Sequence, residues 1–239
     1  MLVVGFPAGP WGTNCWVLAT GAGEQCVIVD PGKDAAPGIE DAVREHGLSP
    51  VAVLLTHGHI DHVWSVVPVC GARGIPAYIH PSDRGMLEDP MAGISAQTAQ
   101  MLAAMTEGRL AAGEPDDVRE LSDGAVLDLA GLSFVVDHAP GHTRGSVMFR
   151  HGASEGIPPL LLSGDVLFEG SIGRTDLPGG DHAAMLDSLA AKVLPLDDDT
   201  VVLPGHGGTT TIGDERATNP YLTALVRQGT SSAAPGRGL

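Results

Sequence analysis

A dense cluster of metal-binding side chains constrains this chain more than any other feature of its sequence. It directly follows an apolar run at 51–55, which predicts a buried strand, and it reads Thr56-His57-Gly58-His59-Ile60-Asp61-His62. Imidazole nitrogens and carboxylate oxygens are the ligands that suit zinc and related metals. Because side chains two residues apart in a strand lie on one side, His57 and His59 can face one cation, and the glycine between them permits a tight bend. Asp61 and His62 then begin the next helix, where they can reach a second cation.

Three later positions repeat one arrangement, in which an apolar strand ends, a glycine follows and a metal-binding side chain comes next. They are His142 after a strand at 132–137, Asp165 after a strand at 160–163 and His206 after a strand at 200–203. Glycine permits a close backbone approach that a Cβ atom would block. Ligands that short loops gather at strand ends form a rigid cage, so the sequence predicts one metal centre built from separate loops.

Short apolar runs alternate with helical stretches, which predicts mixed β-sheets covered by helices in a single domain, residues 1–228. We expect strands at 15–18 and 26–29 as a hairpin, and further strands at 51–55, 76–79, 125–129, 132–137, 145–149, 160–163 and 200–203. We expect helices at 35–46, 61–72, 81–110 and 182–193. The tail at 229–239 is small, polar and rich in Pro and Gly, so we expect it to be disordered.

Within the expected helix at 81–110, Met101, Leu102 and Met105 have the spacing of one helix face. Two interpretations are open. The face packs on the protein core, which the spacing favours, or it forms a lid over the metal pocket.

Charge and cysteine content bear on partners and compartment. The 13 Lys and Arg against 29 Asp and Glu leave a net charge of -16, which argues against a nucleic-acid partner. The first residues have no basic start and are broken by Gly and Pro, and no run of about 18 apolar residues occurs, so we expect no membrane partner and a cytoplasmic protein. The 3 cysteines form no C-x-x-C pair and lie in apolar runs, which favours buried thiols over disulfides.

The ordered motifs closely resemble the metallo-β-lactamase superfamily. They are T-H-x-H-x-D-H at 56–62, G-H at 141–142, S-G-D at 163–165 and P-G-H at 204–206. The resemblance extends over roughly 14–226. It implies an α/β fold of the αββα type, in which two mixed β-sheets lie face to face with helices outside and the metal site at one edge.

Carried over residue by residue, the resemblance implies two divalent metal ions, zinc or alternatively iron or manganese. His57, His59 and His142 would hold the first; Asp61, His62 and His206 would hold the second; Asp165 would bridge them. Asp30, in the sequence Asp30-Pro31-Gly32, matches an early family element that supports the histidine loop from outside the ligand set. The alternative is that Asp30 satisfies turn backbone.

Within the superfamily, the segments 164–168, 173–181 and 203–207 resemble short glyoxalase II-like proteins, which hydrolyse hydroxyacyl-thiol thioesters. No cysteine lies near Asp165, where common β-lactamases place one, and His59 stands where diiron oxygen reductases have Glu. Arg174, in the G-R-T-D segment, either contacts a substrate carboxylate or, as we favour, pairs with an acid and fixes the loop after Asp165.

The resemblance implies that the cations lower the pKa of a bridging water from about 15.7 toward neutrality, so that a hydroxide attacks the thioester of a small molecule. Asp61 and Asp165 would be the catalytic residues, and a thiol with a pKa near about 8.5 leaves without a strong general acid.

Two other functions stay open. Persulfide dioxygenases share the G-R-T-D segment and use one iron, so that function is the main alternative. A metal-stabilised module without catalysis is the third, and it is disfavoured because structural zinc sites have four ligands, whereas this chain offers seven.

Overall fold

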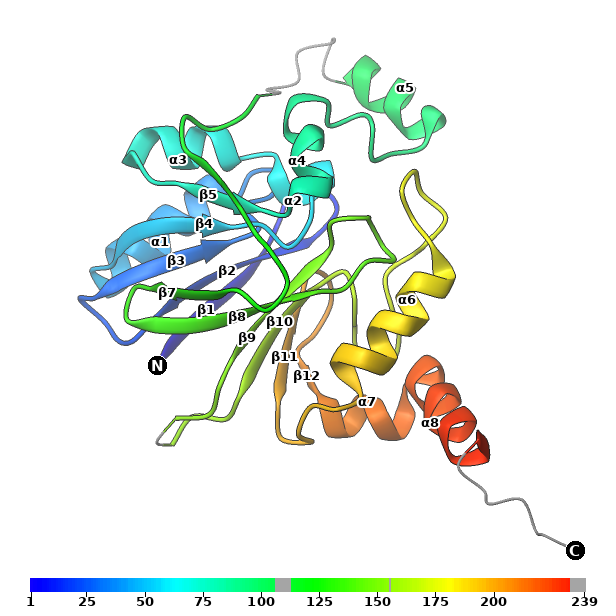
Figure 1. The fold of residues 1–239 in the computed structure, drawn as a ribbon. Helices are drawn as coiled ribbons and strands as arrows, with labels where there is room; N and C mark the ends of the chain where they lie inside the picture. The colour runs from blue at the N-terminus through cyan, green and yellow to red at the C-terminus, as the bar shows by residue number, and fades with distance from the viewer. Residues whose placement is uncertain (106–112, 155, 233–239) are drawn as a thin grey trace, which may run out of the picture.

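A computed structural model describes residues 1–105, 113–154 and 156–232. It contains two six-stranded sheets, with strand orders β1-β2-β3-β4-β5-β6 and β12-β11-β10-β9-β8-β7. The sheets stack face to face, with α1 and α3 outside the first sheet and α6, α7 and α8 on the side of the second (Figure 1). The predicted αββα sandwich with two mixed sheets is confirmed.

The first sheet pairs antiparallel from β1 to β3 and parallel from β3 to β6. Its strands are β1 (Leu2–Ala8), β2 (Thr13–Ala19), β3 (Gln25–Val29), β4 (Ser49–Leu54), β5 (Ala77–Ile79) and β6 (Val118–Glu120). The expected hairpin is confirmed as β2 and β3. The edge strands β1 and β6 are missing from the sequence prediction, because β1 contains Gly and Pro and the three residues of β6 have no apolar alternation.

The second sheet is antiparallel except for one pair, β10 and β11. Its strands are β7 (Val126–Leu129), β8 (Leu132–His138), β9 (Val147–His151), β10 (Leu160–Gly164), β11 (Val201–Pro204) and β12 (Thr210–Thr211). Parallel strands end at the same edge of a sheet, so the residues after β10 and β11, Asp165 and His206, come together there.

The helices are α1 (Ala36–His46), α2 (Ile60–Val63), α3 (Val66–Arg73), α4 (Pro81–Glu88), α5 (Ala96–Met105), α6 (His182–Ser188), the π-helix η1 (Leu189–Val193), α7 (Ile212–Thr218) and α8 (Pro220–Ser232). The predicted end of α1 at Gly47, with φ of 64°, and the predicted helix at 182–193 are confirmed. α8 continues to Ser232, past the expected start of the tail; 233–239 lie outside the described residues.

Two helix predictions are wrong in extent. The helix expected at 61–72 is split into α2 and α3, because the Ser65 N–H donates to Pro31 O at 2.9 Å and its hydroxyl to Gly32 O at 2.7 Å. The helix expected at 81–110 is split into α4 and α5, because Pro90 disfavours helical backbone at the residue before it. Residues 106–110 of that prediction lie outside the described part of the chain.

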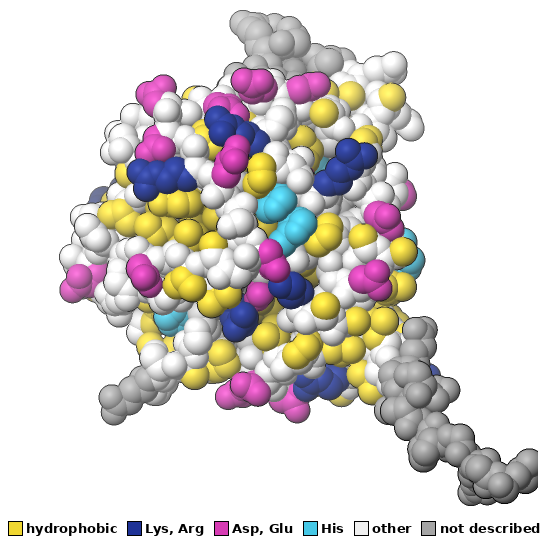
Figure 2. Space-filling view, viewed as in Figure 1, with side chains coloured by type: hydrophobic (Ala, Val, Ile, Leu, Met, Phe, Trp, Pro, Cys, Tyr) yellow, Lys and Arg dark blue, Asp and Glu magenta, His cyan; other side chains and the backbone are white. Residues whose placement is uncertain are grey.

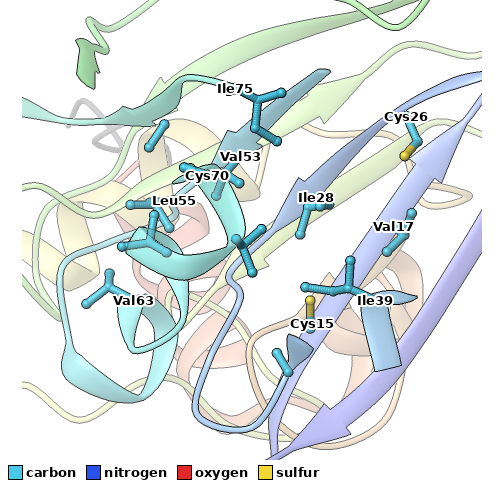
Figure 3. Packing of buried hydrophobic residues seen from close by; sticks show 14 of the residues in the cluster. Cys15, Val17, Cys26, Ile28, Ile39, Val53, Leu55, Val63, Cys70 and Ile75 are labelled. Carbon is cyan, nitrogen blue, oxygen red and sulfur yellow. The ribbon is translucent and has the colours of Figure 1, made fainter. Parts of the chain in front are cut away.

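Three apolar clusters hold the layers together. Val27 and Val29 of β3 face the space between the sheets, whereas Ile28 faces α1, so the period-two alternation buries both faces of this strand. Figure 3 shows the layer between the first sheet and its helices, with Cys15, Cys26 and Cys70 among the buried residues. The third cluster lies beneath α6, η1 and α8 and includes Met148, Leu161, Leu189, Val202 and Leu222. The free, buried cysteines confirm the expectation for them.

On the face shown in Figure 2, basic side chains lie singly or in small groups among acidic ones. Among the residues that the structure describes, no helix is both long and apolar enough to cross a membrane.

Candidate metal centre

All seven predicted ligands meet at one edge of the sandwich. Their possible ligand atoms form three sets, each within 4.8 Å: His57, His59 and His142; His57, His62 and Asp165; and Asp61, His62 and His206. The nitrogens His59 Nδ1 and His142 Nε2 lie 2.8 Å apart. At the other end of the cluster, His206 Nε2 lies 3.2 Å from Asp61 Oδ2.

Asp165 lies between the two ends of this cluster. Its Oδ1 is 3.3 Å from His62 Nε2, whereas its Oδ2 is 3.5 Å from His142 Nε2 and 3.6 Å from His206 Nε2. The two oxygens therefore face histidines of both predicted ligand sets, which is the placement that a bridging carboxylate requires.

Glycines beside the ligands allow this density, as the sequence predicts. Gly164 has a φ of 50°, and a Cβ atom there would lie 2.5 Å from Thr56 Oγ1. A Cβ atom on Gly205 would lie 2.2 Å from Asp165 Oδ1. Neither loop could approach the centre with a larger residue at these positions.

Some buried polar atoms of the cluster have no hydrogen-bond partner within the described residues. Within the described residues, Nε2 of His57, Nε2 of His59 and Oδ1 of Asp165 are buried without a hydrogen-bond partner. Buried polar atoms are nearly always satisfied, so the unpaired His57 Nε2 and Asp165 Oδ1 fit a site that completes itself with cations, whereas His59 turns its other nitrogen, Nδ1, toward His142. Nitrogen and carboxylate oxygen donors in this number suit zinc, iron or manganese.

Asp30 fixes two of these histidines through hydrogen bonds. Its buried carboxylate accepts from Thr56 N at 2.8 Å, from Thr56 Oγ1 at 2.6 Å and from His62 Nδ1 at 2.9 Å. Thr56 Oγ1 in turn lies 3.1 Å from His57 Nδ1. These contacts match the supporting role predicted for Asp30. No local sequence pattern marks this role of Thr56, although Thr56 begins the motif.

Electrostatics favour the metal-binding forms of several ligands. Burial lowers the pKa of His57 well below its ordinary value, and it lowers the pKa of His59 to about 3, so both imidazoles are neutral. Burial opposes ionisation of Asp165, yet the hydrogen bond to His62 and the charges of His62, His142 and His206 together outweigh it and lower the pKa of this carboxyl. His142 Nδ1 donates to Arg174 O at 2.7 Å, which leaves its Nε2 lone pair for a cation.

A cavity of about 400 Å³ opens onto this cluster. Its walls include the apolar side chains Trp11, Ile94, Leu102, Phe168 and Leu177 beside five of the seven ligands. Leu102 of α5 is buried and also lines the cavity, so its placement agrees with both interpretations of this helix face. The side chains of Met101 and Met105 lie outside the description.

Arg174 also lines the cavity, and its guanidinium donates to the Asp176 carboxylate at 2.7 and 2.8 Å. Pairing with an acid is the interpretation favoured from the sequence. The sequence did not reveal Thr13, whose hydroxyl donates to Asp61 Oδ2 at 3.0 Å, because no local pattern marks it.

The family profile described as the Metallo-beta-lactamase superfamily matches residues 8–206. The chain belongs to this superfamily. A solved member, the BLEG-1 B3 metallo-β-lactamase, is 39% identical, with a TM-score of 0.79 over 93% of this chain and 100% of the other. The structure of TTHA1623 in a di-iron-bound form has the same identity and coverage, with a TM-score of 0.72.

Relatives in sequence extend over nearly the whole chain. An uncharacterized protein of Mycobacterium tuberculosis is 50% identical over 229 residues, 95% of this chain and 100% of that protein. The hydroxyacylglutathione hydrolase GloC of Haemophilus influenzae is 33% identical over 207 residues, 84% of this chain and 89% of GloC. The chain is a metallo-hydrolase of the metallo-β-lactamase superfamily.

Proposed function

We propose that this metallo-hydrolase cleaves a small-molecule thioester of the S-2-hydroxyacyl thiol type, using two divalent cations. The observation that carries the metal pair is Asp165, whose two oxygens face histidines of both ligand sets. The relation to GloC supports the thioester, and the di-iron-bound form of TTHA1623 supports a site for two metals. Zinc is the metal we expect, with iron or manganese as alternatives.

We expect the ligands to divide as the family resemblance implies. His57, His59 and His142 would hold one cation; Asp61, His62 and His206 would hold the other; Asp165 would contact both. Cations bound there would supply a water of lowered pKa and would polarise the thioester carbonyl.

The side chains of the protein orient the reactants. Thr13 donates to Asp61 Oδ2 at 3.0 Å and fixes this carboxylate at the mouth of the cavity, where it can accept a hydrogen bond from the attacking water. The apolar wall of Trp11, Leu102 and Phe168 would seat the acyl group and exclude bulk water. The leaving thiolate needs no strong acid, since thiols ionise near about pH 8.5.

The ion pair between Arg174 and Asp176 bears on the carrier thiol. The Arg174 guanidinium already pairs with the Asp176 carboxylate at 2.7 Å. A carboxylate of the carrier thiol would therefore have to share the positive charge of Arg174 with Asp176. We therefore place Arg174 as a loop-fixing residue beside the substrate rather than as its main anchor.

Two measurements on purified protein test the proposal. Elemental analysis should find close to two metal ions per chain, and an S-lactoyl thiol should be hydrolysed at a rate that a chelator abolishes. One bound iron together with oxygen uptake on glutathione persulfide would replace the proposal by the dioxygenase alternative. Hydrolysis of a β-lactam, with no thioester cleaved, would replace it by a lactamase.

A further inference from the structure

Asp83 is a buried carboxylate that touches none of the seven ligand side chains but binds the loops of three of them. It lies on α4, which packs beside α2 (Figure 1). Its Oδ2 accepts from Gly58 N at 3.0 Å and from Thr143 Oγ1 at 2.6 Å, and its Oδ1 accepts from Gly145 N at 2.7 Å. Gly58 stands between His57 and His59, and Thr143 directly follows His142.

Both loops are shaped to meet this carboxylate. A Cβ atom on Gly145 would lie 2.6 Å from Asp83 Cγ, and one on Gly58 would lie 2.8 Å from Asp83 O. A buried carboxylate costs free energy unless strong donors surround it, and here two backbone N–H groups and a hydroxyl do so. Asp83 therefore sets the distance between the loop of His57 and His59 and the loop of His142.

Glu215 likewise joins two segments that are remote in sequence, those that follow Asp165 and His206. Its buried carboxylate accepts from Gly170 N at 2.9 Å and from Thr210 Oγ1 at 2.8 Å. Gly170 lies on the segment that follows Asp165, and Thr210 on the segment that follows His206. Asn219 Nδ2 donates to the same carboxylate at 2.8 Å and completes its hydrogen bonds.

We infer that Asp83 is a positioning residue for the three-histidine ligand set, and that Glu215 positions the segments of Asp165 and His206. Each carboxylate joins loops that are remote in sequence and acts without touching a cation: Asp83 on the three-histidine end, and Glu215 on the His206 end and, through Asp165, on the bridge. The inference rests on the two-metal centre of the proposed function and is independent of the thioester substrate.

The test is a matched pair of carboxylate-to-amide variants, Asp83→Asn and Glu215→Gln. An amide keeps the shape of the carboxylate but replaces one acceptor oxygen by a donor NH2 group. In both networks this group faces N–H or O–H donors, so at least one hydrogen bond is lost. We expect Asp83→Asn to weaken one of two zinc ions about 10- to 100-fold, the usual effect of losing such support, and to leave the other unchanged. Glu215→Gln should weaken the other ion most, with a smaller effect on the first ion through Asp165. Graded chelator competition, read as metal per chain, measures both affinities.

Ligand variants assign the affected ion. In the His59→Ala background, which has already lost the ion of the three-histidine end, Asp83→Asn should cause no further metal loss. In the His206→Ala background, which retains that ion, Asp83→Asn should remove it. Equal weakening of both ions by Asp83→Asn would overturn the inference. So would a lower Tm of the metal-free protein with both affinities unchanged, which is the mark of a purely structural residue.

A milder variant covers the case in which Asp83→Asn does not fold. Thr143→Val removes one of the three donors and should weaken the same ion by a smaller factor; no effect on that ion would overturn the inference. If the wild-type protein binds fewer than two ions, the proposed function fails and the inference fails with it. If it binds two ions but hydrolyses no thioester, only the substrate assignment fails.

Discussion

The two ends of the metal centre differ in their contact with solvent. At the three-histidine end, His57 and His59 are buried and the His142 side chain is 4% exposed. At the other end, the side chains of Asp61 and His206 are 19% and 28% exposed. Both ends lie in one cluster, so the difference reflects the walls around them. Both ends line the cavity, His59 and His142 at one and Asp61 and His206 at the other, but the loop of His57 and His59 is also tied to α4, and the side chains at the Asp61 end are more exposed.

This difference separates holding a metal from presenting it to a substrate. Burial keeps His57 and His59 neutral, and hydrogen bonds to their surroundings fix the ring orientations, so the enclosed end is suited to retain its cation. The open end combines a carboxylate with a half-buried imidazole beside the apolar wall. Substrate should therefore approach the cation of the open end.

Asp165→Ala should have the largest effect, because it removes the only ligand that faces both ends among the seven. We expect kcat to fall about 1000-fold or more and metal content to drop at both ends. Steady-state kinetics and elemental analysis measure this. Asp128→Ala, at an exposed position on β7, serves as the control and should behave as wild type. A variant with full metal content and unchanged kcat would remove the bridging role.

Asp30→Asn should weaken both ions, since Asp30 contacts His62 directly and His57 through Thr56. Each affinity should fall about 10- to 100-fold. Chelator competition under the conditions used for Asp83→Asn gives the comparison. Selective loss of a single ion would show that Asp30 serves one end only.

The open end should release its metal faster than the enclosed end. Mixing the holoprotein with excess chelator should give two phases of metal release, recorded by a chromogenic chelator. His206→Ala should lack the fast phase and His59→Ala the slow one. A single phase in the wild-type protein would contradict the distinction between the ends.

Leu102→Ala should affect substrate binding at the open end and leave metal content intact. Loss of this wall contact should lower kcat/KM about tenfold, mainly through KM, as expected for about 1–2 kcal/mol of apolar contact. Val126→Ala, which alters an exposed apolar residue on β7, is the matched control. An unchanged KM would mean that α5 does not cover the bound substrate.

The smallest expected effect concerns the apolar layer between the first sheet and its helices, which contains the three cysteines. Burial raises the pKa of Cys26 to about 11 and that of Cys70 to about 12, and it also raises the pKa of Cys15. A raised thiol pKa means less thiolate at neutral pH, so a thiol reagent should react only after unfolding. Removal of metal should leave the reaction equally slow. Fast labelling of the cysteines in the metal-free protein would show that the layer between the first sheet and its helices becomes accessible without the cations.

Much of this protein follows from its sequence alone. The ligands at 56–62 are neighbours in the chain, so the local geometry of the strand and helix orients their side chains without contacts from remote segments. His142, Asp165 and His206 each follow an apolar strand and a glycine, a local pattern that marks them as members of the same centre. The apolar runs likewise indicate the strands of the sheets, because the order of apolar and polar residues in a run shows whether one or both faces of the strand are buried.

Only the tertiary structure decided the features that depend on partners remote in sequence. Asp83 and Gly145 are 62 positions apart, and Asp83 looks like any surface acid of a short helix until folding brings the loops to it. The break at Ser65 arises from its bonds to Pro31 and Gly32, and the edge strand β6 exists because β5 offers unpaired backbone. Hydrogen bonds of this kind form between loops that no local pattern connects, so the geometry of the fold, rather than residue type, selects them.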